Sequence, residues 1–319
     1  MDTYLNEQIS ETFAGKNILI TGGTGSIGSE IVRQLLKCRP KQIRVFSRDE
    51  SKHFFLEKEI EKIKTPIDVK FFIGDIRDKE RLEKAFQDVN IVFHAAALKH
   101  VPYCEYNSFE AIKTNVYGTQ NVIDLAIKNN IEKVVAISTD KAVNPSNIMG
   151  ITKLLMERMI ISSRHYVGSA ITKFSVVRFG NVLNSRGSVV PMWVNQINDG
   201  GPVTVTDKRM KRFFMTIPEA VNLIFFVSTI MQGKEIFVLK MREENIYNMA
   251  KKTIKDHGNG KKIKIKFIGS RDGEKITEKL FTEEEKELML EMDNLYIIYP
   301  NKAIYEERVK TYKYLKIKK

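Results

Sequence analysis

The stretch KNILITGGTGSIGSEIVRQLLK, residues 16–37, decides the fold. Its apolar run at 18–20 is typical of a strand buried on both faces, and residues 29–37 follow the periodicity of an amphipathic helix. Glycines stand between the two elements at a spacing that indicates a dinucleotide-binding turn in this context. Glycine permits the tight turn and lets a pyrophosphate approach the free amides at the helix N-terminus. We therefore expect a dinucleotide in contact with Gly22, Thr24, Gly25, Ser26, Ile27 and Gly28.

The second expected strand, residues 42–46, predicts which dinucleotide is bound. It ends in Ser47-Arg48-Asp49-Glu50. An acidic residue at this place accepts the ribose hydroxyls of NAD, whereas an arginine accommodates the 2′-phosphate of NADP. Because Arg48 comes first and Ser47 adds a donor, we expect NADP, with NAD as the alternative. The cofactor-binding residues predicted in this segment are Ser47, Arg48, Asp49 and Lys52.

Two further strands are expected at 69–73 and 90–93. Asp75, after the first, either accepts from the adenine amino group or caps the helix that begins near residue 78. Small side chains after the strand at 90–93 let a flat cofactor lie against the backbone. Lys99 would offer its positive charge to a phosphate there. Asn115 is expected to begin a helix and to bond backbone or a relay water. The cofactor-binding residues predicted here are Asp75, Ile76, Ala95, Ala97, Lys99 and Asn115.

The alternation of strands and helices indicates the fold class. Strands separated by helical patterns at these spacings predict an α/β protein with a doubly wound, Rossmann-like parallel sheet. In such sheets, ligands bind outside the carboxyl ends of the strands.

A second informative stretch is KVVAISTDKAVNPSNIMGITK, residues 133–153. The run at 134–137 predicts a buried strand, and Thr139, Asp140 and Lys141 stand at its carboxyl end. The helix that follows is expected to start at residues 145–146, with Met149 and Lys153 on one face. A hydroxyl, an acid and two amines indicate proton transfer. A solvated loop before an ordinary amphipathic helix fits these residues equally well.

Composition limits the class of protein. The 319 residues suffice for one large domain or two. Cys38 and Cys104 are too few for a disulfide framework or a thiolate site, and we predict no bound metal. No apolar segment approaches the roughly 20 residues of a membrane span, and the first residues lack the blocks of a signal peptide. We therefore expect a cytoplasmic protein.

The net charge of +13 favours anionic partners. The basic residues are dense only at 251–266 and in the tail KTYKYLKIKK, and no nucleic-acid-binding motif accompanies them. We therefore expect no nucleic acid partner. The basic C-terminal tail suggests at most a weak contact with a membrane surface.

As a set, TGGTGSIG, AAALKHVP, TNVYGT and STDK followed by MGITK resemble the extended short-chain dehydrogenases/reductases. More narrowly, the chain resembles the nucleotide-sugar 4,6-dehydratases of bacterial polysaccharide and nonulosonate biosynthesis, which act on nucleotide-linked N-acetylglucosamine. Later segments fit the same family, and the similarity covers about residues 15–300. These segments are VRFGNVLNSRGSVVP (177–191), GGPVTVTDKRMKRFFM (200–215) and GSRDGEK (269–275).

The resemblance implies a reaction and a role for each site residue. Hydride leaves C4 of the sugar, water is eliminated between C5 and C6, and hydride returns to C6. Asp140 would be the acid to the C6 hydroxyl and Lys141 the base at C5, which requires a lowered lysine pKa. Thr139 would orient the C4 hydroxyl, and Lys153 would bind the nicotinamide ribose. The implied substrate-binding residues are Lys99, Asn181, Arg186, Val189, Thr206, Arg212, Arg271 and Glu274, with the three arginines on the diphosphate.

Two positions depart from the family pattern. Met149 stands where the wider superfamily has a tyrosine base, and a thioether cannot do acid–base work. A subset of the 4,6-dehydratases also carries methionine there. The segment at 269–275 lacks the proline that usually precedes its second glycine, while Arg271 and Glu274 are retained.

The resemblance also divides the chain. We expect an NADP-binding domain at 14–180 and about 213–236, a substrate-binding lobe at 181–212 and about 237–300, and terminal arms at 1–13 and 301–319. We further expect a homo-oligomer acting on UDP-N-acetylglucosamine, with GDP as the alternative nucleotide. The alternative functions are a nucleotide-sugar 4-epimerase, which normally needs the missing tyrosine, and a non-catalytic NADP-binding sensor or scaffold.

Overall fold

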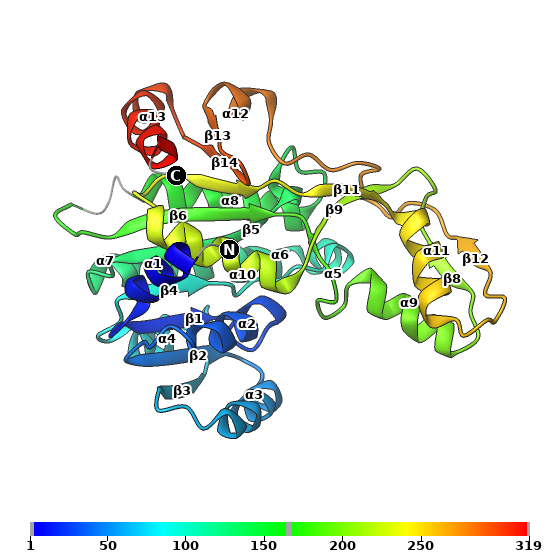
Figure 1. Ribbon diagram of the computed structural model, residues 1–319, viewed down its shortest axis with the longest axis horizontal. Coiled ribbons are helices and arrows are strands. Elements are labelled where there is room, and N and C mark those ends of the chain that lie inside the picture. The colour runs from blue at the N-terminus through cyan, green and yellow to red at the C-terminus, as the bar shows by residue number, and fades with distance from the viewer. Residues whose placement is uncertain (1–2, 164–167, 318–319) are drawn as a thin grey trace.

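The computed structural model describes residues 3–163 and 168–317. Within these residues, strands assemble into one large sheet. Its strands are β1 (Asn17–Thr21), β2 (Gln42–Ser47), β3 (Asp68–Ile73), β4 (Ile91–His94), β5 (Lys133–Thr139), β6 (Lys173–Phe179), β10 (Ile236–Leu239), β13 (Met289–Glu291) and β14 (Leu295–Ile298). Their order is β13-β14-β10-β6-β5-β4-β1-β2-β3 (Figure 1). Neighbours from β10 to β3 run parallel, and β14 pairs antiparallel with both β10 and β13.

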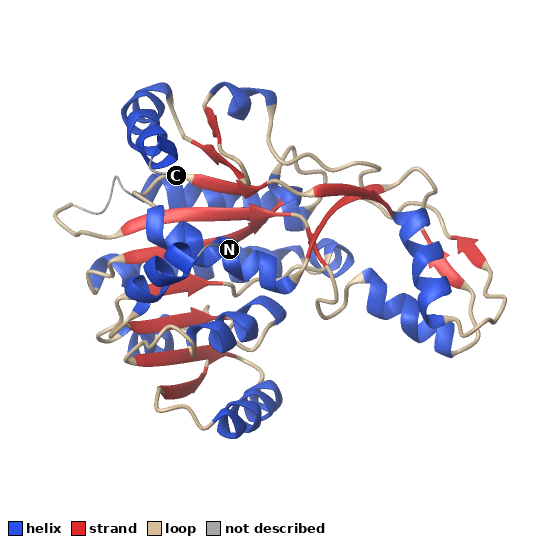
Figure 2. Cartoon of the chain, viewed as in Figure 1, coloured by secondary structure: helices blue, strands red, loops and turns tan. Residues whose placement is uncertain are grey.

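Helices cover both faces of this sheet (Figure 2). One face carries α1 (Thr3–Phe13), α2 (Ser26–Leu35), α3 (Glu50–Ile63) and α10 (Ile217–Ile230). The other carries α4 (Lys79–Phe86), α7 (Gly118–Lys128) and α8 (Ile148–Ser162). Alternate residues of a strand point to opposite faces. Accordingly, Ile18 and Ile20 join the first core layer and Leu19 joins the second.

The order of the strands creates the place for a site. The chain runs outward from β1 through β2 to β3 and then returns to β4 on the other side of β1. The connections from β1 and β4 therefore leave in opposite directions and open a crevice at the carboxyl ends of the strands. The predicted doubly wound, Rossmann-like α/β fold is confirmed.

Short helical segments lie at this carboxyl edge. Between β4 and α7 the chain forms α5 (Val101–Tyr106), α6 (Ser108–Ile112) and a π-helical turn, η1 (Lys113–Tyr117). A 3₁₀ turn, η2 (Asp140–Ala142), directly follows β5.

A smaller lobe lies beyond the carboxyl ends of the parallel strands (Figure 1). It is built from α9 (Val189–Asn198), β8 (Val203–Val205), α11 (Ile246–His257) and β12 (Ile265–Phe267). Its own core is centred on Trp193, which is fully buried. A three-stranded sheet connects this lobe to the main body. Its strands are β7 (Asn181–Val182), β9 (Lys211–Met215) and β11 (Arg242–Asn245).

The large sheet takes up residues that the sequence assigned to the lobe. Strands β10, β13 and β14 fall almost wholly within 237–300, the range expected to bind substrate. Their residues alternate in burial less than a half-exposed strand does, and such short runs do not reveal which sheet they join. Helix α12 (Glu283–Glu287) directly precedes β13. Otherwise the division into two domains stays a prediction.

Two predicted boundaries were wrong. Helix α8 begins at Ile148 instead of residues 145–146, because the Asn147 side chain accepts from the Gly150 amide and caps it. Asn115 lies inside the π-helical turn instead of starting a helix. Strand β9 ends at Met215, and α10 begins at Ile217 after the capping box of Thr216 and Glu219.

The expected terminal arms are helical in the described residues. Ile9 and Phe13 lie four positions apart on α1 and are buried, with the Phe13 ring 4.8 Å from that of Phe225. Helix α13 (Lys302–Ile317) covers most of the basic tail, whose last two residues lie outside the described ranges. None of the described helices is both long and apolar enough to cross a membrane.

Candidate active site

A cavity of about 1080 Å³ opens at the carboxyl ends of the parallel strands. Its walls come from the segments after β1 to β6, together with α8 and the first turn of α9. The sequence-predicted residues that line it are Gly22, Thr24, Gly25, Ser26, Ile27, Gly28, Ser47, Arg48, Asp49, Lys52, Asp75, Ile76, Ala95, Ala97, Lys99, Thr139, Lys141, Lys153, Asn181, Arg186 and Val189.

The glycine-rich turn is closed too tightly for side chains. Gly22 has φ +69°, and a Cβ there would lie 2.7 Å from the backbone nitrogen of Ala96. A Cβ on Gly28 would lie 2.3 Å from the Gly22 carbonyl oxygen. Gly25 caps α2 without a side-chain hydrogen bond, so the first amides of this helix face the cavity without a capping oxygen. Free amides at a helix N-terminus are donors for an anion.

The groups after β2 and β3 pair with one another. Both carboxylate oxygens of Asp49 contact Lys52, one at the backbone amide and one at the ammonium group, so that Asp49 caps α3. Arg48 lies 3.4 Å from Asp75, which also binds Arg77. Asp75 does not cap α4; the cap is Asp78, whose side chain accepts from the Arg81 amide.

The segment after β4 is fixed by buried polar side chains. His94 bonds Thr21 at 2.8 Å and Thr119 at 3.0 Å, as expected of a packed histidine. Its pKa falls to about 3 because it is buried and lies near the charge of Lys153. Asn115 lies outside the lining and bonds both backbone groups of Leu98, so it shapes the wall.

Thr139, Asp140 and Lys141 form one hydrogen-bonded group after β5. The Thr139 hydroxyl donates to Oδ1 of Asp140 at 2.9 Å, and the Lys141 ammonium donates to the same oxygen at 3.0 Å. Lys141 also donates to Asn181 at 3.1 Å. Asp140 is fully buried and lies behind the lining, whereas Thr139 and Lys141 reach the cavity.

Helix α8 brings Met149 and Lys153 to the cavity wall. The Lys153 ammonium donates to the Ile137 carbonyl at 2.5 Å. Burial lowers the pKa of Lys153 to about 8, although Glu157 partly opposes this. Met149 packs against Cys104 and belongs to a small apolar cluster. An amine, a hydroxyl and a hidden carboxyl at one wall can bind a polar substrate and move protons.

On the substrate side, Arg186 lines the cavity and also contacts the glycine-rich turn. Its guanidinium donates to the Thr24 carbonyl at 2.9 Å and its amide donates to Ser26 at 3.0 Å. Lys99 in turn donates to the Arg186 carbonyl at 2.8 Å. This arginine therefore joins the loop after β7 to the glycine-rich turn.

Four predicted substrate residues do not line the cavity. Arg212 is buried, and its guanidinium donates hydrogen bonds to the carbonyls of Lys211, Lys275 and Ile276. It ties the loop at 269–276 to β9, and it also lies 3.4 Å from Glu274. The other two, Thr206 and Arg271, lie in the smaller lobe and on the exposed surface of this loop.

Residues 18–300 match a family described as polysaccharide biosynthesis protein. The chain belongs to this family.

Relatives of the chain cover most of its length. An uncharacterized membrane protein of Methanocaldococcus jannaschii is 50% identical over 315 residues, 95% of this chain and 93% of the relative. An inverting UDP-N-acetylglucosamine 4,6-dehydratase of Campylobacter jejuni is 43% identical, covering 91% and 84%. A UDP-glucose 4-epimerase of Rickettsia rickettsii is 43% identical, covering 90% and 83%.

A solved structure agrees with these relatives. The X-ray structure of Pen from Bacillus thuringiensis superposes with a TM-score of 0.87 at 43% identity, and covers 90% of each chain. The resemblance to the nucleotide-sugar 4,6-dehydratases is confirmed.

Two charged residues of this family member were missed from sequence. Glu278 lies 4.0 Å from Lys141, and Arg178 is buried between Glu157 and Glu285. The arginine inside the apolar strand at 173–179 was a usable signal, since a charge is rarely buried without a partner. Nothing local marks Glu278, because its partner is distant in sequence.

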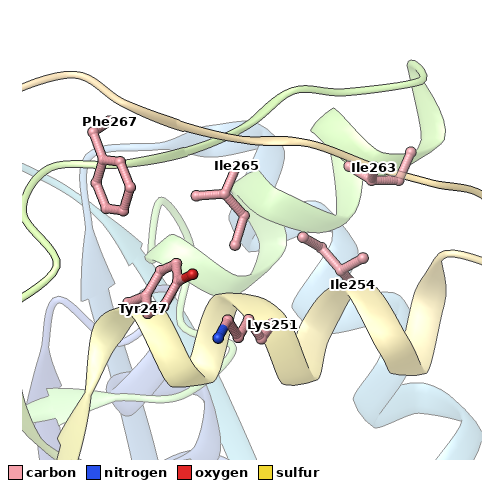
Figure 3. A pocket seen from close by; sticks show the side chains of 6 residues that line it. All are labelled: Tyr247, Lys251, Ile254, Ile263, Ile265 and Phe267. Carbon is pink, nitrogen blue, oxygen red and sulfur yellow. The ribbon is translucent and has the colours of Figure 1, made fainter.

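A second hollow, of about 400 Å³, lies in the smaller lobe (Figure 3). It is lined by Tyr247, Lys251, Ile254, Ile263, Ile265 and Phe267. The Lys251 ammonium lies 4.3 Å from the centre of the Tyr247 ring. This hollow shares no lining residue with the larger cavity and contains none of the predicted site residues.

Proposed function

We propose that the chain catalyses the NADP-dependent 4,6-dehydration of UDP-N-acetylglucosamine to a 4-keto-6-deoxy sugar. The observation that carries this proposal is the bonded group of Thr139, Asp140 and Lys141 at the wall of a cavity behind a dinucleotide turn. The dehydratase relative supports it. A sensor would have no use for this group, because proton transfer requires it and nucleotide binding does not.

The residues present fit a nicotinamide dinucleotide. The open amides of α2 and the crowding at Gly22 and Gly28 suit a pyrophosphate. Both oxygens of Asp49 already contact Lys52. Arg48 uses one guanidinium nitrogen on Asp75, so its other donors can reach a 2′-phosphate, which favours NADP over NAD. When bound, this cofactor supplies reversible hydride acceptance.

The side chains of this group divide the proton work. Lys141 faces the cavity and is assigned the proton of C5. Asp140 is hidden, and its link to the cavity is the Thr139 hydroxyl bonded to its Oδ1. We assign to this pair the protonation of the C6 hydroxyl as it leaves. Lys153, fixed by the Ile137 carbonyl, is assigned the nicotinamide ribose.

A second candidate is a nucleotide-sugar 4-epimerase, which the relative from Rickettsia rickettsii favours. An epimerase needs a group that accepts the C4 hydroxyl proton, but no elimination machinery. Assembly as a homo-oligomer, cytoplasmic location, weak membrane contact of the tail and substrate roles for Arg271 and Glu274 stay predictions.

The test is incubation of the purified protein with UDP-N-acetylglucosamine, with the products followed by NMR. Dehydration gives a methyl signal at C6 and a ketone at C4. Formation of UDP-N-acetylgalactosamine without a methyl signal would establish the epimerase instead. No conversion of UDP- or GDP-linked sugars would favour the sensor.

The cofactor is expected to copurify as NADP, because each turnover returns the hydride and release is unnecessary. Heat denaturation followed by chromatography of the supernatant identifies it. Arg48→Ala is expected to weaken NADP binding by about tenfold or more through loss of a charge-assisted bond. NAD as the sole nucleotide in the wild-type supernatant would overturn the assignment to Arg48.

Met149→Tyr is expected to bring no gain in turnover. Met149 is buried against Cys104 and Ala111, so a phenol there must displace its neighbours and finds no prepared partner. Met149→Leu, which nearly conserves volume, is the control and should stay close to wild type. A large rate increase in the tyrosine variant would mean that methionine leaves the site short of a base.

A further inference from the structure

A second carboxyl group approaches Lys141 from the C-terminal part of the chain. Oε1 of Glu278 lies 4.0 Å from the Lys141 ammonium nitrogen, and the Glu278 side chain is only 4% exposed. Glu278 does not line the cavity. Of the charged groups near Glu278, Lys141 is the one that lines the cavity.

Three bonds hold the loop that precedes this carboxyl group, whose Oε2 also lies 3.7 Å from the Lys275 ammonium nitrogen. The Gly273 carbonyl accepts from the side chains of Ser146 and Asn147, at 2.7 and 3.0 Å. The Lys275 ammonium donates to the Val143 carbonyl at 2.8 Å. The loop that carries Glu278 is thus bonded to both ends of the segment 143–147, which lies between η2 and α8. The fold therefore fixes the position of this loop.

Two buried carboxyl groups share the charge of Lys141, which itself reaches the cavity. Oδ1 of Asp140 binds the ammonium group, while Oδ2 is buried without a hydrogen bond. The charged groups that face Glu278 are Asp140, Lys141, Arg212 and Lys275. Burial and the charge of Asp140 raise the pKa of Glu278, against the three cations. While Asp140 is ionised, a proton on Glu278 reduces the repulsion between the two.

We propose that Glu278 takes a proton from Lys141, so that the lysine meets the substrate as a neutral amine. This inference rests on the proposed dehydration. One N–H bond of the ammonium breaks and one O–H bond forms on Glu278, with no other change. The amine then accepts the C5 proton and returns it when C5 is reprotonated. Glu278 is a positioning residue that acts through Lys141.

The test compares the pH dependence of kcat in the wild type, Glu278→Gln, Glu278→Asp and Glu283→Gln. Glutamine cannot take the proton, so Lys141 must lose it to solvent. Glu278→Gln is then expected to lower kcat about 10²-fold at neutral pH with KM unchanged, and kcat should rise steeply with pH where the wild-type profile is flat. Aspartate should restore part of the flat profile. Glu283 is exposed in α12, and its variant should match the wild type.

A purely electrostatic role predicts the opposite result. If Glu278 only balances the charge of Lys141, its removal eases proton loss from the amine. Glu278→Gln would then be as active as the wild type or more so, with its acid limb moved to lower pH, and the inference would be overturned.

An infrared difference spectrum of wild type minus Glu278→Gln gives a second reading without substrate. A band of a protonated carboxyl group is expected, and its absence would overturn the inference. A wild-type protein that shows the band but does not dehydrate would support the proton on Glu278 and refute only the proposed function.

Discussion

Lys141→Ala is expected to lower turnover of UDP-N-acetylglucosamine by about 10²–10⁴-fold while the protein keeps its bound cofactor. The Lys141 amine reaches the cavity and is the assigned base, and alanine removes it without disturbing the backbone of η2. Asp140→Asn should lose a similar factor, because an amide neither holds nor delivers the proton. NMR of the product and the nucleotide content of the purified variants are the measurements.

Lys128→Ala is the matched control for these two variants. Lys128 forms an exposed ion pair with Glu83 at the end of α7 and does not line the cavity. It should keep wild-type turnover. Near-native turnover in Lys141→Ala would refute the acid–base assignment, and loss of the nucleotide would turn the result into one about binding.

Arg178→Ala is expected to lower the free energy of unfolding by about 3–5 kcal/mol. Arg178 is fully buried and its guanidinium binds Glu157 at 2.7 Å, Glu285 at 2.8 Å and the Leu280 carbonyl at 3.0 Å. Alanine leaves the Glu157 carboxylate buried without its cation. Urea unfolding followed by circular dichroism measures the loss.

Arg33→Ala supplies the comparison. Arg33 pairs with Glu59 on the surface, where both side chains are more than a third exposed. Water screens such a pair, so the expected loss is below about 1 kcal/mol. Equal losses in the two variants would show that burial of Arg178 adds no cost, contrary to the argument.

Local patterns carried the part of the fold that was predictable. The strand before the glycine-rich turn and the strand before Thr139 are continuous apolar runs. Such runs can be recognised without knowledge of distant segments. Residues that directly follow such strands must lie at one edge of a parallel sheet. This is why the cofactor-side residues, Asn115 excepted, were found to line one cavity.

Contacts between distant segments could not be predicted from local patterns. Arg186 was assigned to a diphosphate by residue type, but its position is decided by the Thr24 carbonyl far earlier in the chain. The sequence suggested that Arg212 could bind a diphosphate, but its guanidinium donates to the backbone carbonyls at 275–276. Chemistry alone predicts what a side chain binds, and only the fold decides whether that side chain is free to do so.

The late arrival of the C-terminal segment has a consequence during synthesis. A ribosome releases the parallel strands, the glycine-rich turn and Lys141 first, at about 5–20 residues per second. Until residues 295–298 emerge, the outer edge of β10 lacks β14 and is open to pairing with another chain. Glu285, which pairs with Arg178, and Glu278, which lies near Lys141, are also synthesised late. A nascent chain would thus be able to bind a dinucleotide before it can convert a sugar substrate. A chain whose synthesis stops before residue 295 would keep the edge of β10 unpaired and open to aggregation.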